Sequence, residues 1–198
     1  MLQNSKRFCL FGLVLLCAAI THGKEGSPES NKHWQSQPSG KYEFLRFPYA
    51  EEKEAAIRAA LPIRRFKLQI FGAADVLNGS PAVNYYIEFH VSGKALLHAI
   101  SGTEKSGIYA GKISLTDYAR LCLLYETMIA EAGGPEKFGY EIKSSHPVIS
   151  KLTLIFADQS PVRQHRNDAN FGDFKFWVFE NVMKNIESEV KWEKVEAN

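Results

Sequence analysis

Three residues of one short segment carry side chains suited to binding or to proton transfer, namely Tyr86, Glu88 and His90. They alternate along the chain, so in a β-strand all three point to the same face of the sheet. A histidine titrates near neutral pH and a neighbouring carboxylate can orient it, as in a general acid and base pair. Alternating polar residues are also typical of a strand with one solvent-exposed face. We favour this second interpretation and predict that the exposed face is a binding surface.

A second candidate site is the basic segment that holds Arg163, His165 and Arg166, with Asp168 and Asp173 nearby. Guanidinium groups bind anions well, so the segment could hold an anionic group. Charged residues also protect the edge strand of a sheet from pairing with another chain, and this role needs no ligand. We favour the second interpretation and keep the three basic residues as a candidate binding site.

The remaining candidates for chemistry are weak. Cys122 is the one cysteine outside the leader described below, and its neighbours in a helical pattern are apolar, which indicates a core residue rather than a nucleophile. The chain has no Gly-x-Ser-x-Gly, His-Glu-x-x-His or Cys-x-x-Cys motif, no phosphate loop and no dinucleotide fingerprint. We therefore predict no catalytic residue, no metal site and no cofactor.

The first 23 residues have the pattern of a secretory signal peptide, because Lys6 and Arg7 precede the uncharged apolar run from Phe8 to Ile20. Thirteen residues are too few to cross a hydrocarbon layer of about 30 Å, so a permanent membrane helix is the less favoured alternative. Lipid attachment at Cys17 is also disfavoured, because the bulky Leu16 precedes it. We expect a secreted or periplasmic protein with no stable membrane insertion after cleavage.

Removal of the leader changes the charge balance. Lys6 and Arg7 leave with it and no acid does, so 24 basic and 22 acidic residues become 22 and 22. A formally neutral chain gives little reason to expect nucleic acid as a partner. The partner that we expect is an envelope protein or a small ligand.

The composition divides the rest of the chain into two parts. Residues 24–48 are rich in Ser, Pro, Asn, Gln and charge, which predicts a flexible linker. Residues 49–198 are expected to form a single domain. Within it, a short helix is predicted from Tyr49 to Leu61, where Glu54 and Arg58 are one helical step apart and Pro62 ends the helix.

Alternation predicts a first strand at 64–71, with Phe66, Leu68 and Ile70 on one side. Alternation and turn residues predict two hairpins after it. The first hairpin pairs 82–91 with 94–100 through a two-residue turn at Ser92-Gly93, and the second pairs 151–157 with 162–166. Residues 101–111 are predicted to be a loop because of their glycines. With the two-residue turn, His90 opposes Ala95 while His98 opposes Ile87, so the two histidines lie on opposite faces and cannot share a metal.

Two long helices complete the prediction. The first begins with Ser114 as its N-cap and ends at Gly133-Gly134, and its Tyr118, Leu121, Cys122, Tyr125 and Met128 recur at helical spacing. The second starts near Asp173 and is predicted to bury Phe174, Trp177, Val178, Val182 and Ile186. The predicted fold is α+β, a small antiparallel sheet of two hairpins with two main helices packed on one face.

Four segments follow one another in the chain: Tyr85–Gly93, Gly111–Ser114, Leu152–Asp158 and the helix that runs on to Trp192. In this order they resemble a family of secreted bacterial domains of unknown function, over about residues 66–192. Many members of that family carry a cysteine pair and a proline ahead of the hairpin, where this chain has Asn78-Gly-Ser-Pro81. The resemblance implies an arrangement of hairpins and helices, but it implies no redox role and no activity.

The sequence thus favours a non-catalytic binding or interaction domain of unknown specificity. Its predicted binding residues are Tyr86, Glu88, His90, Arg163, His165 and Arg166. The alternative is a small envelope hydrolase or ligand-processing enzyme that uses the His90 and Glu88 pair.

Overall fold

The computed structural model describes residues 42–45, 49–72, 82–140, 148–158, 160–168 and 172–195. The chain divides into two compact units, residues 1–40 and 41–198, and every described residue belongs to the second unit. The predicted signal peptide, most of the predicted linker and the segment Asn78-Gly-Ser-Pro81 lie outside the described residues.

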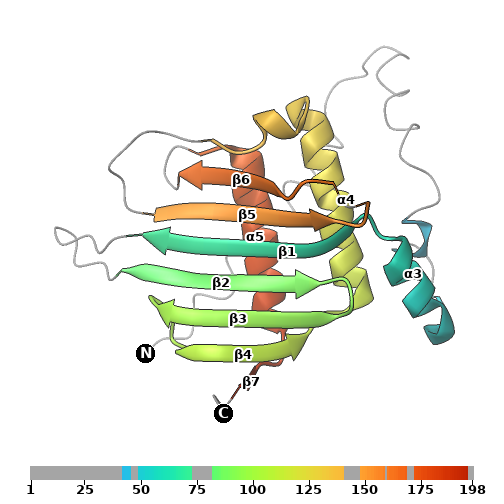
Figure 1. Ribbon diagram of the computed structural model, residues 1–198, viewed down its shortest axis with the longest axis horizontal. Coiled ribbons are helices and arrows are strands. Elements are labelled where there is room, and N and C mark those ends of the chain that lie inside the picture. Colours follow the sequence, from blue (N-terminus) through green and yellow to red (C-terminus); the bar gives the residue numbers. More distant parts are fainter. Residues whose placement is uncertain are drawn as a thin grey trace, which may run out of the picture. The chain divides into compact units, whose positions relative to one another are not determined.

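The second unit is built on a seven-stranded antiparallel sheet with the strand order β6-β5-β1-β2-β3-β4-β7 (Figure 1). The strands are β1 (Ile63–Gly72), β2 (Val83–His90), β3 (Lys94–Ser101), β4 (Gly107–Lys112), β5 (Val148–Phe156), β6 (Arg163–Asp168) and β7 (Glu193–Lys194). The prediction of a small sheet of two hairpins is therefore wrong. The first strand joins the two hairpins, because β1 pairs with β2 on one side and with β5 on the other.

Strands β4 and β7 extend the sheet beyond the predicted hairpins. The prediction of a loop over residues 101–111 is wrong from Gly107 onward, because β4 pairs along β3 and β7 pairs with β4. A Cβ atom on Gly111 would collide with the side chain of Val190 and would lie 3.0 Å from the carbonyl oxygen of Lys191. This glycine therefore allows a close approach of the chain that follows the last helix, rather than marking a loop.

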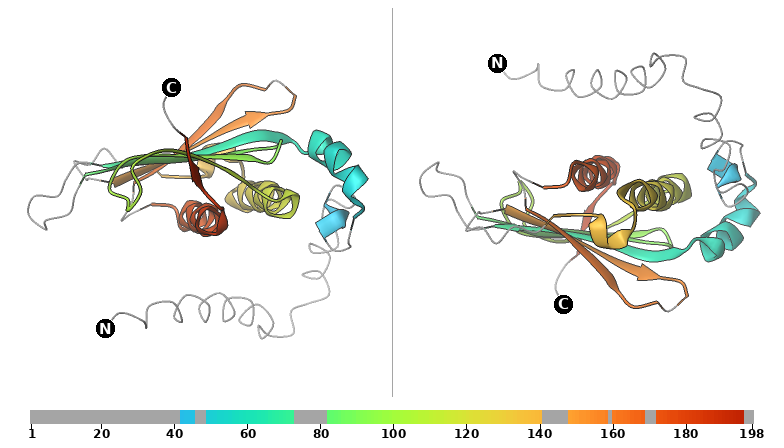
Figure 2. Two further views of the ribbon diagram at one scale, coloured as in Figure 1. Left: turned by 90° about the horizontal axis from the view of Figure 1, so that it is seen from below. Right: turned by 90° about the horizontal axis from the view of Figure 1, so that it is seen from above.

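Two long helices, α4 (Leu115–Ala132) and α5 (Phe174–Glu189), lie on the same face of the sheet (Figure 2). The predicted caps of α4 are confirmed, since the Ser114 side chain accepts a hydrogen bond from the amide of Asp117 and the helix ends at Gly133. A 3₁₀ turn, η3 (Pro135–Lys137), follows α4. Among the described residues, no helix is both long enough and apolar enough to cross a membrane.

Three short helical segments precede the sheet: η1 (Glu43–Leu45), η2 (Glu51–Lys53) and α3 (Glu54–Ala60). Glu54 and Arg58, one helical step apart, form an ion pair with 2.7 Å between the Arg58 Nη2 and Glu54 Oε1 atoms. Tyr42, which lies in the stretch predicted to be linker, is buried in the core. The packed domain therefore includes residues before Tyr49.

The core lies between the sheet and the two long helices. From β1 the core includes Phe66, Leu68 and Ile70, the side chains predicted to share one face. The predicted apolar face of α4 is also confirmed, and Tyr118, Leu121 and Cys122 are fully buried. Burial of such apolar side chains is the main source of folding free energy in a domain of this size.

The predicted core face of α5 is wrong in part. The side chains that α5 buries are Phe176, Phe179, Glu180 and Met183, whereas Phe174 and Trp177 are 63% and 51% exposed. These two exposed rings stack on each other, with centroids 5.8 Å apart. Nearly every residue from Phe174 to Phe179 is apolar, so helical spacing fits more than one face and the periodicity did not select the correct one.

Candidate binding face of the sheet

The sheet has one covered face and one open face. Helices α4 and α5 lie against the covered face, and no described helix packs on the opposite side, which we call the open face (Figure 2). Because paired residues of adjacent strands share a face, the strand register identifies the side chains of the open face. Its central residues are Arg65, Lys67, Gln69, Tyr86, Glu88, His90, Leu96, His98, Ile108, Ala110, Lys151 and Thr153.

The register of the first hairpin corrects the predicted placement of its histidines. The turn has three residues, Val91 to Gly93, and Gly93 closes it in the left-handed conformation with φ of 89°. As a result Tyr86 pairs with His98, one residue away from the predicted register. His98 therefore lies on the same face as Tyr86, Glu88 and His90. The prediction that the two histidines lie on opposite faces is wrong.

Glu88 is the centre of an ion cluster on the open face. Its Oε1 atom lies 3.0 Å from Lys67 Nζ, and its Oε2 atom lies 3.6 Å from Arg65 Nη1 and 3.4 Å from His90 Nε2. Its side chain is only 9% exposed, and burial by itself raises the pKa of a carboxyl group. The three basic neighbours outweigh burial and hold the pKa of Glu88 below its ordinary value near 4.5. Glu88 is therefore ionised at neutral pH.

Tyr86 lies beside this cluster and contacts two basic side chains. The His98 and Tyr86 rings make a T-shaped contact at an interplanar angle of 89°, with centroids 5.0 Å apart. Lys67 Nζ lies 3.7 Å from the Tyr86 ring centroid, within the range of a cation–π contact. Because Lys67 contacts both Glu88 and Tyr86, it joins the aromatic ring to the ion cluster.

The open face carries more basic than acidic side chains. Its cations are Arg65, Lys67, Lys94, Lys112, Lys151 and Arg166, and its carboxylates are Glu88, Asp168 and Glu193. Apolar residues interrupt this charge on β3 and β4, where Leu96 pairs with Ala110 and Ile108 is 45% exposed. The surface therefore combines positive charge, one aromatic ring and exposed aliphatic groups.

The second predicted cluster is divided between the two faces of β6. Arg166 lies on the open face opposite Lys151 and makes an ion pair with Asp168 at 3.0 Å. Arg163 instead lies over the Phe156 ring and donates to the Tyr125 hydroxyl at 3.4 Å, and His165 is 5% exposed on the covered face. These three residues do not form one surface.

His165 belongs to a buried hydrogen-bond network. Its Nδ1 atom lies 3.0 Å from the carbonyl oxygen of Phe138, which only accepts, so Nδ1 carries the proton. In the neutral ring Nε2 then accepts from the Tyr125 hydroxyl at 2.9 Å. Burial lowers the pKa of His165, the nearby charge of Arg163 also lowers it, and the bond to Phe138 opposes part of this change. The neutral ring is a structural part of the core.

The geometry limits the chemistry that Glu88 and His90 can do. Glu88 already contacts three basic groups, which stabilise its ionised form and make it a poor proton acceptor at neutral pH. Within the part of the chain that the structure describes, no three His, Cys, Asp or Glu side chains are grouped closely enough to hold a metal ion. The arrangement suits binding of a polar or acidic surface better than proton transfer.

Sequence reasoning missed three members of this surface: His98, Lys94 and Lys112. The signal for His98 was the glycine at the third position of the turn, which is typical of a three-residue hairpin loop. The signal for Lys112 was its alternation with Ile108 and Ala110, which is typical of one face of a strand. This signal was missed because the glycines of the segment suggested a loop. Once β4 is recognised, Lys94 and Lys112 pair directly.

Comparison with known proteins adds no assignment. No protein-family model matches the chain, and no curated protein is significantly similar to it in sequence. The resemblance based on Tyr85–Gly93 and the segments that follow it therefore stays a prediction.

Proposed function

We propose that this chain is a non-catalytic binding domain, and that its open sheet face binds a partner protein in the secreted or periplasmic location expected from its leader. The observation that carries the proposal is the division of the sheet into two faces. Two helices cover one face, and the other displays charged, aromatic and aliphatic side chains across adjacent strands.

The composition of the open face favours a protein partner. Tyrosine, arginine and exposed aliphatic residues are common at the centres of protein interfaces, and charged residues are common at their rims. Here Tyr86 and His98 lie on the central strands, with Ile108 next to His98 on β4. The cations around them suit a partner with an acidic rim, since opposite charges increase the rate of association.

The alternative function is a small hydrolase that uses His90 and Glu88. It is supported by the 3.4 Å distance between His90 Nε2 and Glu88 Oε2. It is weakened by Lys67 and Arg65, which also contact this carboxylate and keep it ionised. We therefore place the enzyme second.

The test is quantitative capture of partners by the full tagged chain expressed in its native cells. The double variant Tyr86→Ala, His98→Ala removes both rings from the open face without altering the core. Trp177→Ala is the matched control, because it removes an exposed aromatic ring from α5 instead. We expect the double variant to bind a stoichiometric partner at least about tenfold more weakly than the wild-type chain does. A tenfold loss of affinity corresponds to about 1.4 kcal/mol.

Retention of that partner by the double variant, or its loss in Trp177→Ala, would contradict the proposal. If the captured wild-type chain turns over a substrate and the His90→Ala variant does not, the result would instead support the enzyme.

A further inference from the structure

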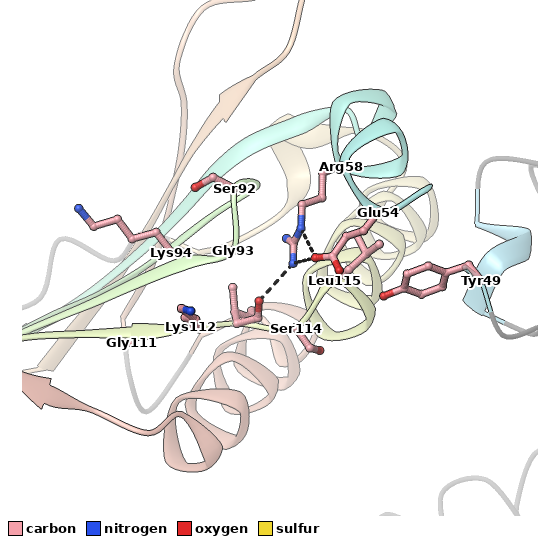
Figure 3. Close-up of a pocket in the computed structure, with 11 residues that line it drawn as sticks. Tyr49, Glu54, Arg58, Ser92, Gly93, Lys94, Gly111, Lys112, Ser114 and Leu115 are labelled. Carbon is pink, nitrogen blue, oxygen red and sulfur yellow. Dashed lines mark hydrogen bonds and ion pairs between the residues drawn. The ribbon is translucent and has the colours of Figure 1, made fainter. Parts of the chain in front are cut away.

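A cavity lies at one end of the sheet, where α3, the turn between β2 and β3, and the junction of β4 with α4 meet (Figure 3). Its volume of about 560 Å³ lies within the range typical of small-molecule sites. The residues that line it are Tyr49, Glu54, Arg58, Ser92, Gly93, Lys94, Gly111, Lys112, Ile113, Ser114 and Leu115. Three of these side chains are cationic and one is acidic.

Arg58 forms a fixed wall of the cavity. Its Nη1 atom donates to the carbonyl oxygen of Val91 at 2.8 Å. Its guanidinium also contacts Glu54 at 2.7 Å (Figure 3). A Cβ atom on Gly93 would lie 3.2 Å from Arg58 Nη2, so the glycine leaves room for the guanidinium against the turn. Arg58 and Glu54 largely neutralise each other, and the charge that remains in the lining comes from the two lysines.

Lys94 and Lys112 are directly opposite each other on β3 and β4. Like charges at such positions repel and destabilise the strand pair. Neither lysine makes an ion pair with any described residue. The other like-charged pair on the open face differs, since Lys151 opposes Arg166 and Arg166 is paired with Asp168.

We propose that this cavity binds a small soluble anion with two or more negative charges, and that Lys94 and Lys112 provide the charge that holds it. A phosphate ester is the class that fits best. Lysine ammonium groups act as point charges for phosphate, and the cavity has room for an organic group beside it. The anion would relieve the repulsion between the two lysines. Lys94 and Lys112 also lie on the open face, but the test of this site uses small anions and does not depend on the proposed protein partner.

The test measures thermal unfolding of the full chain with inorganic phosphate or glucose 6-phosphate added in rising concentration. Glucose and sodium chloride at matched concentration and ionic strength are the controls. A ligand that binds only the folded state raises Tm. We expect glucose 6-phosphate to raise the Tm of the wild-type chain, inorganic phosphate to raise it less, and the controls to leave it unchanged.

Three variants separate this site from general surface charge. Lys112→Gln and Lys94→Gln should each weaken the apparent affinity for glucose 6-phosphate by about tenfold or more, since a hydrogen bond to a charged group is lost. Both should also raise the Tm without ligand, because one of the two repelling charges is gone. Lys151→Gln is the matched control on the same face and should keep the wild-type response.

Two results would overturn the proposal. One is a wild-type chain whose Tm responds to neither anion beyond the sodium chloride control. The other is an equal loss of response in Lys112→Gln and Lys151→Gln, which would show that the anions bind the basic surface without using the cavity.

Discussion

The two faces of strand β2 differ in what their side chains contact, although they share one backbone. Ile87 and Phe89 point to the covered face and are fully buried among apolar side chains. Tyr86 and Glu88 point to the open face and contact basic side chains instead. The comparison indicates that the covered face provides most of the folding free energy, whereas the open face can carry charge and rings for binding at a small cost to stability.

The largest expected effect concerns two aromatic residues of α5 that differ only in the side they face. Phe179→Ala removes a fully buried ring and should lower the free energy of unfolding by about 3–5 kcal/mol. Trp177→Ala removes an exposed ring that stacks on Phe174, and should cost less than about 1.5 kcal/mol. Equilibrium denaturation in urea measures both changes. Equal costs would mean that the outer side of α5 is also packed.

A smaller effect is expected from pH on the covered face. The pKa of His165 is lowered in the folded protein, so the fold favours the neutral ring and the unfolded chain binds the proton more readily. The contribution of His165 to stability is therefore complete above its ordinary pKa near 6.5 and is lost as the pH falls below that value. The free energy of unfolding should fall between about pH 7 and pH 5, and His165→Gln should reduce this fall.

The control for that prediction is direct observation of the His165 ring. Its imidazole resonance in NMR should titrate with a midpoint below 6.5. A His165→Gln variant with the same pH dependence as the wild type would show that this ring does not set the acid sensitivity of the fold.

Local patterns predicted the parts of the fold that depend on neighbouring residues. The alternation of Phe66, Leu68 and Ile70 identified the covered face of β1, and the caps identified the start and end of α4. Strand β4 was missed because its glycines suggested a loop. Gly111 is required because the chain near Val190, which is distant in the sequence, packs closely against it. The face of α5 was misjudged because its first residues are apolar on nearly every side.

The candidate site, like the fold, was predictable only where it depends on residues that are close in the sequence. Alternation placed Tyr86, Glu88 and His90 on one face, which the structure confirms. The error of one residue in the turn moved His98 to the wrong side, since a register shift of one exchanges the two faces of a strand. The division of Arg163, His165 and Arg166 depends on how β6 pairs with β5, which their shared basic character could not indicate.

The most direct test of the division between the two faces compares adjacent residues of β2. Ile87→Ala on the covered face should lower the free energy of unfolding by about 2–5 kcal/mol, as expected for a buried aliphatic residue. Tyr86→Ala on the open face should lower it by less than about 1.5 kcal/mol, the loss of its ring contact with His98 and of its cation–π contact with Lys67. Urea denaturation of the two variants beside the wild type gives both values. A cost for Tyr86→Ala equal to that of Ile87→Ala would contradict the account, because the open face would then be a packed surface rather than one available to a partner.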